Sequence, residues 1–153
     1  MAPPRVSSEA TSSDSPPAHA YTHDFSVEPA DIDELGHANN VVWIRWVNEA
    51  AIAHSDAVGL GADAYRAIGV LWVVRRHDIE YLVPALPGES LEALTWVATF
   101  RGATSLRRTY FRRTSDRTTL AHAATTWALL DGATGRPRRV PADIMARYGF
   151  AGA

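Results

Sequence analysis

The sequence predicts an α+β fold in which a curved antiparallel sheet of five or six strands wraps around one long central helix. Three observations point to this fold. Residues 41–59 have the length and composition of a helix that is apolar on most of its sides. Four long segments rich in β-branched and aromatic residues follow it. The breaks between those segments are short, which favours antiparallel pairing of neighbouring strands.

The first element is expected to be a strand at residues 22–29, THDFSVEP, because polar and apolar residues alternate there and the stretch ends at a proline. A polar loop, DIDELGHANN at residues 31–40, follows it. This loop places three carboxylates, a glycine, a histidine and two asparagines directly before the apolar run VVWIRWV. The loop is therefore expected to lead into the N-terminus of the central helix.

The central helix is predicted at residues 41–59 although its first residues would suit a strand on propensity alone. Its length, the alanines that follow Asn48 and a closing glycine at Gly59 favour a helix instead. Asn39 or Asn40 suits the N-cap position. Apolar residues cover most of the circumference near the start, so we expect burial on nearly all sides of this helix.

The remaining chain is expected to form a short helical link at residues 61–69, then four strands, then a glycine-rich turn and a short helix at residues 142–150. The four strands are predicted at residues 70–83, 89–102, 105–116 and 118–131. Short breaks separate them, so neighbouring strands are expected to pair as an antiparallel meander.

The length of 153 residues and a hydrophobic content of 46% suit one domain with its own core. We expect that domain at residues 21–150. Residues 1–20 are rich in Pro, Ser and Ala and are expected to be a disordered tail. The tail lacks the apolar run of a signal peptide, and the chain has no stretch of about 18 apolar residues. A soluble cytoplasmic protein without a membrane partner is therefore expected.

Composition excludes several classes of function. The net charge of −2 lacks the basic excess of a general nucleic-acid binder, so no nucleic-acid partner is expected. The absence of cysteine excludes disulfide frameworks, zinc-thiolate sites and thiol nucleophiles. The histidines lack the spacing of metal ligands, so no metal site is expected. The tryptophans, including Trp43 and Trp46, are expected to belong to the core.

Charge is distributed unevenly along the chain. Residues 1–60 carry two arginines against nine acids, whereas residues 101–153 carry ten arginines against three acids. The basic part could contact the acidic part or hold an anionic ligand. Five of these arginines fall on two predicted strands: Arg101, Arg107, Arg108, Arg112 and Arg113. Alternation places some on each face, so they cannot all serve one ligand, and solvated surface charge is the alternative for each.

The loop also carries a motif, Asp-x-Asp-x-x-Gly-His-x-Asn-Asn. Six residues form it: Asp31, Asp33, Gly36, His37, Asn39 and Asn40. Together with residues 75–91 and 125–141, this motif resembles hotdog-fold acyl-CoA thioesterases of the 4-hydroxybenzoyl-CoA thioesterase-like family. The resemblance covers about residues 20–150 and three separate stretches, which makes it more specific than the motif alone.

The resemblance implies hydrolysis of an acyl-CoA or acyl-carrier thioester, with coenzyme A as part of the substrate and no separate cofactor. It implies a homodimer or a dimer of dimers, in which sheets join edge to edge and active sites lie at the interface. The family's catalytic carboxylate falls on Asp33, and the main-chain N–H that polarises the carbonyl falls on Asn40. Arg101 aligns loosely as a ligand of the coenzyme A phosphates, with Gly36 and Asn39 also expected to bind substrate.

The physical chemistry of a thioester supports these assignments independently. Its carbonyl carbon needs a nucleophile or an activated water, and the developing oxyanion needs preorganised donors. Unpaired N–H groups at a helix N-terminus are such donors, and the same positive end favours an ionised Asp33. Gly36 permits the tight turn that folds this carboxylate back over the helix start. Asp33 could act as nucleophile or as general base.

The other residues of the motif have alternative roles. His37 could order the loop through a hydrogen bond or transfer a proton. Asp31 and Glu34 are expected to shape or solvate the loop. Two other functions also stay open. A hydratase or dehydratase of the same fold would want an aspartate and a histidine acting together, but Asp33 and His37 are close in sequence and lack an Asn-Pro context. The last alternative is a non-catalytic acyl-CoA or acyl-carrier binding module.

Overall fold

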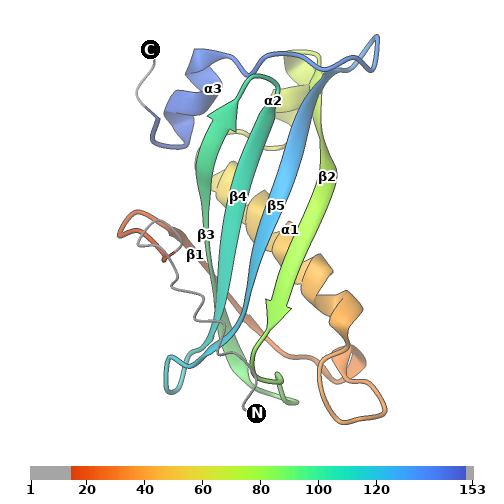
Figure 1. The fold of residues 1–153 in the computed structure, drawn as a ribbon, viewed down its shortest axis with the longest axis vertical. Helices are drawn as coiled ribbons and strands as arrows, with labels where there is room; N and C mark the ends of the chain where they lie inside the picture. The colour runs from red at the N-terminus through yellow and green to blue at the C-terminus, as the bar shows by residue number, and fades with distance from the viewer. Residues whose placement is uncertain (1–14, 151–153) are drawn as a thin grey trace, which may run out of the picture.

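The computed structural model describes residues 15–150 and consists of a curved five-stranded antiparallel sheet with a long helix, α1, against one face (Figure 1). The predicted α+β class and the hotdog arrangement of sheet and helix are confirmed. Residues 1–14 of the predicted disordered tail lie outside the described residues, so the expected division into tail and domain stays a prediction.

The element bounds lie close to those predicted. The strands are β1 (Tyr21–Ser26), β2 (Val70–Tyr81), β3 (Ser90–Arg101), β4 (Thr104–Arg113) and β5 (Thr119–Asp131). The helices are α1 (Asn40–Ala57), α2 (Ala62–Ala67) and α3 (Ala142–Arg147), with a single 3-10 turn, η1 (Pro29–Asp31), between β1 and α1. No helix in this part of the chain is long and apolar enough to cross a membrane.

Both ends of α1 follow from local sequence. Asn39 is the N-cap, and its side-chain oxygen accepts a hydrogen bond from the Val41 N–H at 3.0 Å. At the other end the helix stops before Gly59, whose φ of +78° is a left-handed conformation that glycine adopts without steric cost. The sequence allowed Asn39 or Asn40 as the cap, and the structure selects Asn39.

One face of α1 packs against the sheet and the opposite face does not. Trp43, Trp46 and Val47 are no more than 2% exposed, and the Trp43 ring lies 5.2 Å from that of Phe111 on β4. The opposite face carries exposed apolar residues: Val41, Ile44 and Ile52, which we call the outer strip. The expected burial on nearly all sides is therefore wrong for the single chain, because five strands cover only one side of a helix.

The strand order is β1-β3-β4-β5-β2. Strands β3, β4 and β5 form the predicted meander, but the expected pairing of β2 with β3 is wrong, because β2 pairs with β5 at the far edge. The link between β2 and β3 is held at both ends and makes no hairpin. Its first N–H groups, from Leu82 and Val83, donate to the Leu120 carbonyl, and its Glu89 carbonyl accepts from the Val27 N–H. The outer edge of β2 pairs with no strand within residues 15–150.

Two apolar clusters stabilise the two ends of the molecule. One surrounds Trp46 and Phe111 beneath the first half of α1. The other lies beneath α2 and α3 and includes Leu129, Ile144 and Tyr148. The polar loop at residues 31–40 therefore lies at the N-terminal end of α1, whereas α2 and α3 close the opposite end of the sheet (Figure 1).

Candidate functional site

Asp31 anchors the loop that precedes α1. Its carboxylate is 2% exposed and accepts hydrogen bonds from the Glu28 N–H at 2.9 Å and from Arg45 Nη2 at 2.7 Å. Its carbonyl accepts from the Asn39 N–H at 2.9 Å. These hydrogen bonds hold the loop against α1, so the loop-shaping role expected of Asp31 is confirmed.

Asp33 folds back over the helix start as predicted. One carboxylate oxygen, Oδ1, accepts from the Leu35 N–H at 2.9 Å and from the His37 N–H at 3.4 Å. Gly36 makes the turn with a φ of +79°, and its N–H donates to the Asp33 carbonyl at 3.0 Å. Within residues 15–150 the second oxygen, Oδ2, accepts no hydrogen bond. The half-buried carboxylate is thus held by one oxygen and available through the other.

The main chain of His37 is part of the same turn. Its carbonyl accepts from the Asp33 N–H at 2.8 Å, while its own N–H approaches the Asp33 carboxylate. These bonds order the loop through the His37 backbone. In the described part of the chain its imidazole makes no hydrogen bond, so the ring is available for another role.

The N-terminus of α1 presents one unused amide. The Asn39 side-chain oxygen accepts a hydrogen bond from the Val41 N–H, and the Asn39 carbonyl accepts one from the Val42 N–H at 2.9 Å. The Asn40 N–H, one residue earlier, has no acceptor among the described residues. Its carbonyl accepts from the Tyr81 hydroxyl of β2 at 3.2 Å. Because the first amides of a helix carry the positive end of its dipole, this N–H is a donor suited to a developing negative charge.

These groups share one pocket of about 380 Å³, which we call the loop pocket. It lies between the loop, the first turn of α1 and the end of β2. Four of the predicted site residues line it: Asp33, His37, Asn39 and Asn40. Gly36 shapes the loop without lining the pocket. The arrangement offers a carboxylate, an imidazole and a helix amide around one space.

The structure does not bring Arg101 to this pocket. Arg101 is exposed at the end of β3, next to the Gly102 turn and at the opposite end of the sheet from the loop (Figure 1). Two other arginines from the predicted group serve as surface charge. Arg112 pairs with Glu92 at 3.1 Å and Arg113 pairs with Glu89. Within one chain, Arg101 and Asp33 cannot contact the same small ligand.

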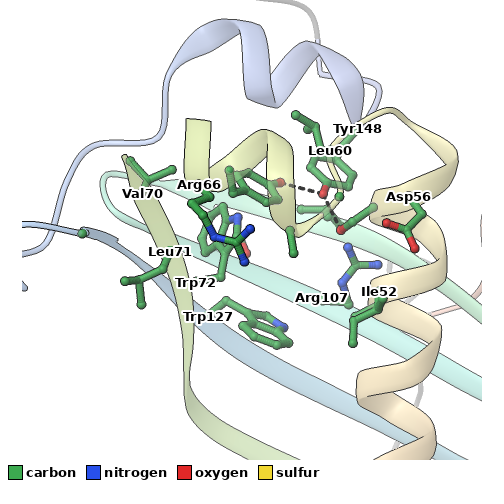
Figure 2. A pocket seen from close by; sticks show the side chains of 18 of the residues that line it. Ile52, Asp56, Leu60, Arg66, Val70, Leu71, Trp72, Arg107, Trp127 and Tyr148 are labelled. Carbon is green, nitrogen blue, oxygen red and sulfur yellow. Dashed lines mark hydrogen bonds between the residues drawn. The ribbon is translucent and has the colours of Figure 1, made fainter. Parts of the chain in front are cut away.

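A larger pocket, which the sequence did not indicate, lies beside the second half of α1. It has a volume of about 860 Å³ and is walled by α1, α2 and the sheet, with Tyr148 closing one side (Figure 2). Arg107 lies in this pocket and is 4% exposed. The alternation of side chains along β4 could have indicated that Arg107 is buried. Arg107 shares its face of the strand with Phe111, which is fully buried.

Comparison with known proteins gives a family-level match. The family model of the thioesterase-like superfamily matches residues 27–148. No curated protein sequence matches the chain.

Solved structures share the fold. A candidate oleoyl thioesterase from Lactobacillus plantarum superposes with a TM-score of 0.81 and 22% identity over 86% of this chain, which spans only 52% of that protein. The 1,4-dihydroxy-2-naphthoyl-CoA thioesterase Slr0204 from Synechocystis has a TM-score of 0.78 and 15% identity, covering 84% and 95% of the two chains. The protein SAV2348 from Staphylococcus aureus, in complex with CoA, has a TM-score of 0.78 and 12% identity, covering 84% and 80%.

Proposed function

The chain belongs to the thioesterase-like superfamily, and we propose that it hydrolyses an acyl-CoA thioester to a carboxylic acid and the free thiol. One observation carries the proposal. The unused Asn40 N–H and the half-buried Asp33 carboxylate line the same pocket at the positive end of α1. A thioester needs both an amide donor for its carbonyl oxygen and a group that delivers oxygen to its carbonyl carbon.

In the proposed reaction the thioester carbonyl oxygen accepts from the Asn40 N–H, which stabilises the negative charge that develops on it. Asp33 then acts in one of two ways. It either removes a proton from water as the water oxygen attacks the carbonyl carbon, or it attacks that carbon itself to form an anhydride that water later cleaves. In both cases the carbon–sulfur bond breaks, the thiolate leaves and takes a proton, and the acyl group is released as the carboxylic acid.

Coenzyme A is the proposed thiol. The fold match to the Staphylococcus aureus protein in complex with CoA supports this choice over an acyl carrier protein. Arg101 stays a proposed ligand of the coenzyme A phosphates, and its distance from the loop pocket means that a second subunit would have to supply it.

We propose a homodimer joined through β2. The unpaired outer edge of this long strand and the exposed outer strip of α1 both suit a second copy. Antiparallel pairing of two β2 strands would set the Val70 end of one beside the Tyr81 end of the other. Tyr81 lines the loop pocket, whereas Val70 lines the large pocket. The loop pocket of one subunit would therefore open toward the large pocket of its partner, as an interfacial active site requires.

Thiol release across a panel of acyl-CoA esters tests the proposal. Asp33→Asn should lower kcat/KM by about 10²- to 10⁴-fold, because the amide neither attacks nor accepts a proton. Glu34→Gln, in the same loop and exposed, is the matched control and should leave kcat/KM unchanged. Thiol release that is unaffected in Asp33→Asn would remove this carboxylate from the mechanism.

The alternatives give different results in the same experiment. If no acyl-CoA or acyl-carrier thioester releases thiol, a non-catalytic binding module replaces the hydrolase. Loss of the ultraviolet absorbance of an enoyl-CoA without thiol release would identify a hydratase, with Asp33 and His37 as its acid and base.

A further inference from the structure

Arg107 is a buried cation whose neighbours are all neutral. Its Nη1 donates to His54 Nδ1 at 2.9 Å and to Thr95 Oγ1 at 3.0 Å. Its guanidinium carbon lies 5.7 Å from the centre of the Tyr148 ring. No carboxylate of residues 15–150 forms an ion pair with it, in contrast to Arg112 and Arg113 on the same strand. A buried charge without a counter-ion is costly, so this site is suited to an anion.

His54 does not supply negative charge and does not share the positive charge. Burial and the neighbouring Arg107 lower the pKa of His54 to about 4, so its imidazole is neutral at pH 7. An arginine can only donate, so Nδ1 is the acceptor and Nε2 carries the ring proton. Burial lowers the pKa of Arg107 to about 10, which still leaves the guanidinium charged at pH 7. The pair therefore carries one positive charge.

Apolar and aromatic side chains surround this charge. Trp72 of β2 and Trp127 of β5 lie on one side of the large pocket and α1 lies on the other, with Arg107 between them (Figure 2). The Trp127 indole N–H is buried and has no acceptor among the described residues. The volume of about 860 Å³ is within the range of pockets for small ligands. Exposed Ile52 and Leu71 leave the pocket open between α1 and β2.

Hydroxyl groups complete the polar part of the pocket. The Tyr148 hydroxyl lies 2.7 Å from Ser55 Oγ and 2.8 Å from the Tyr65 hydroxyl (Figure 2). Burial is the main cause that raises the pKa of Tyr65, which keeps its phenol neutral and able to donate. One carboxylate, that of Asp56, does line the pocket, but it is exposed at the rim. The interior of the pocket thus presents hydrogen-bond donors and one cation among aromatic side chains.

We propose that the large pocket binds an apolar, aromatic molecule through a carboxylate that Arg107 neutralises. Two kinds of ligand could provide such a carboxylate. The carboxylate could be at the far end of an acyl group, a case that rests on the proposed function, or it could belong to a free aromatic acid, a case that requires no hydrolysis.

Calorimetry with 2-naphthoate and its neutral isostere 2-naphthamide tests the binding. The wild-type chain should bind the carboxylate at least about ten-fold more tightly, because a carboxylate forms a charged hydrogen bond with Arg107 and the neutral amide does not. Arg107→Gln should abolish that preference. Arg76→Gln, on the exposed surface of β2 outside this pocket, is the matched control and should keep it.

Equal binding of the two probes by the wild-type chain overturns the proposal, whether or not the variants fold. A folded Arg107→Gln that still prefers the carboxylate also overturns it.

Thiol release from 4-carboxybenzoyl-CoA and benzoyl-CoA separates the two sources. If the acyl group supplies the carboxylate, the wild-type chain should prefer 4-carboxybenzoyl-CoA in kcat/KM and Arg107→Gln should lose this preference. Equal rates for both esters, together with carboxylate-selective binding of 2-naphthoate, assign the pocket to a free acid. If neither these nor any other acyl-CoA is hydrolysed, the proposed function fails while the calorimetric result still decides the binding proposal.

Discussion

The pockets at the two ends of α1 are built in opposite ways. The loop pocket takes most of its polar groups from residues 33–40, and its two main features are a main-chain amide and a carboxylate held by main-chain N–H groups. The large pocket takes its polar groups from residues as far apart as Ser55 and Tyr148, and its charge lies on a buried side chain. Local sequence is thus sufficient to build a helix-end donor, whereas a buried cation requires the packing of several elements.

The strongest test of this contrast removes the helix-end donor. Asn40→Pro deletes the N–H at the first position of α1, where proline is well tolerated. The preceding residue, Asn39, already has the extended conformation that proline requires, with a φ of −61° and ψ of 139°. We expect thiol release to fall by about 10²- to 10³-fold in kcat.

Asn40→Ala is the control for that variant, because it keeps the N–H and should keep most of the activity. Circular dichroism should show the same helix content in both. Full activity of a folded Asn40→Pro variant would mean that the oxyanion donor lies elsewhere.

The large pocket should make stability depend on pH through His54. The folded-state pKa of about 4 is below the ordinary histidine pKa of 6.5, so the unfolded chain binds a proton first as the pH falls. The contribution of His54 is complete above pH 6.5 and is lost as the pH falls toward 4. We expect roughly 2–3 kcal/mol less stability from this residue at pH 4.5 than at pH 7.5.

Urea unfolding of the wild-type chain and of His54→Gln at several pH values isolates that contribution. The variant should show a flatter dependence between pH 6.5 and pH 4.5. Parallel curves for the two proteins would show that His54 protonates equally easily in the folded chain.

A smaller effect is expected at the N-cap. Asn39→Ala removes the acceptor of the Val41 N–H and should destabilise the chain by about 1 kcal/mol, whereas Asn39→Asp keeps an acceptor and should be close to neutral. Thermal unfolding of both variants measures this difference. Equal destabilisation by alanine and aspartate would indicate that Asn39 acts through something other than its cap.

The smallest effect is expected from Tyr65→Phe, which removes one hydroxyl of the large pocket and keeps the ring. Loss of the hydrogen bond to Tyr148 should cost about 1 kcal/mol or less, since Tyr148 keeps Ser55 as a partner. Urea unfolding measures the change. Tyr81→Phe serves as the comparison, because it also removes a hydroxyl that makes one hydrogen bond, but at a more exposed position. A loss well above that of Tyr81→Phe and beyond about 3 kcal/mol would mean that the three hydroxyls act as one network.

The sequence predicted the loop pocket well because its determinants are adjacent in the chain. Asn39 caps α1, Gly36 adopts a left-handed backbone conformation, and the Asp33 carboxylate folds back toward the helix start. Each of these features is determined by residues fewer than ten positions apart. The buried role of Arg107 was not predicted, since alternation gives the face of a strand but not what covers that face. Its neighbour His54 is on α1, and only the packing of α1 on β4 brings the two side chains together.

The position of β2 was mispredicted for a related reason. Short breaks favour hairpins between strands that are consecutive in sequence. Here the Leu82 and Val83 N–H groups donate to the Leu120 carbonyl, so the end of β2 is already paired beside β5 before β3 begins. Burial around α1 was overestimated because the apolar pattern of Val41 and Ile52 does not distinguish a contact within the chain from one with a second copy. Contacts between distant segments were therefore the part of the fold that sequence reasoning missed.

The hydrogen bond from the Tyr81 hydroxyl to the Asn40 carbonyl connects the outermost strand to the residue whose amide would polarise the substrate. In the proposed dimer, this hydrogen bond would connect assembly through β2 to the position of the Asn40 amide. Dilution below the dissociation constant of a β2-joined dimer would free the edge strand, loosen Tyr81 and lower specific activity before any unfolding. The Tyr81→Phe variant, lacking the link, would lose activity at concentrations where the dimer is intact.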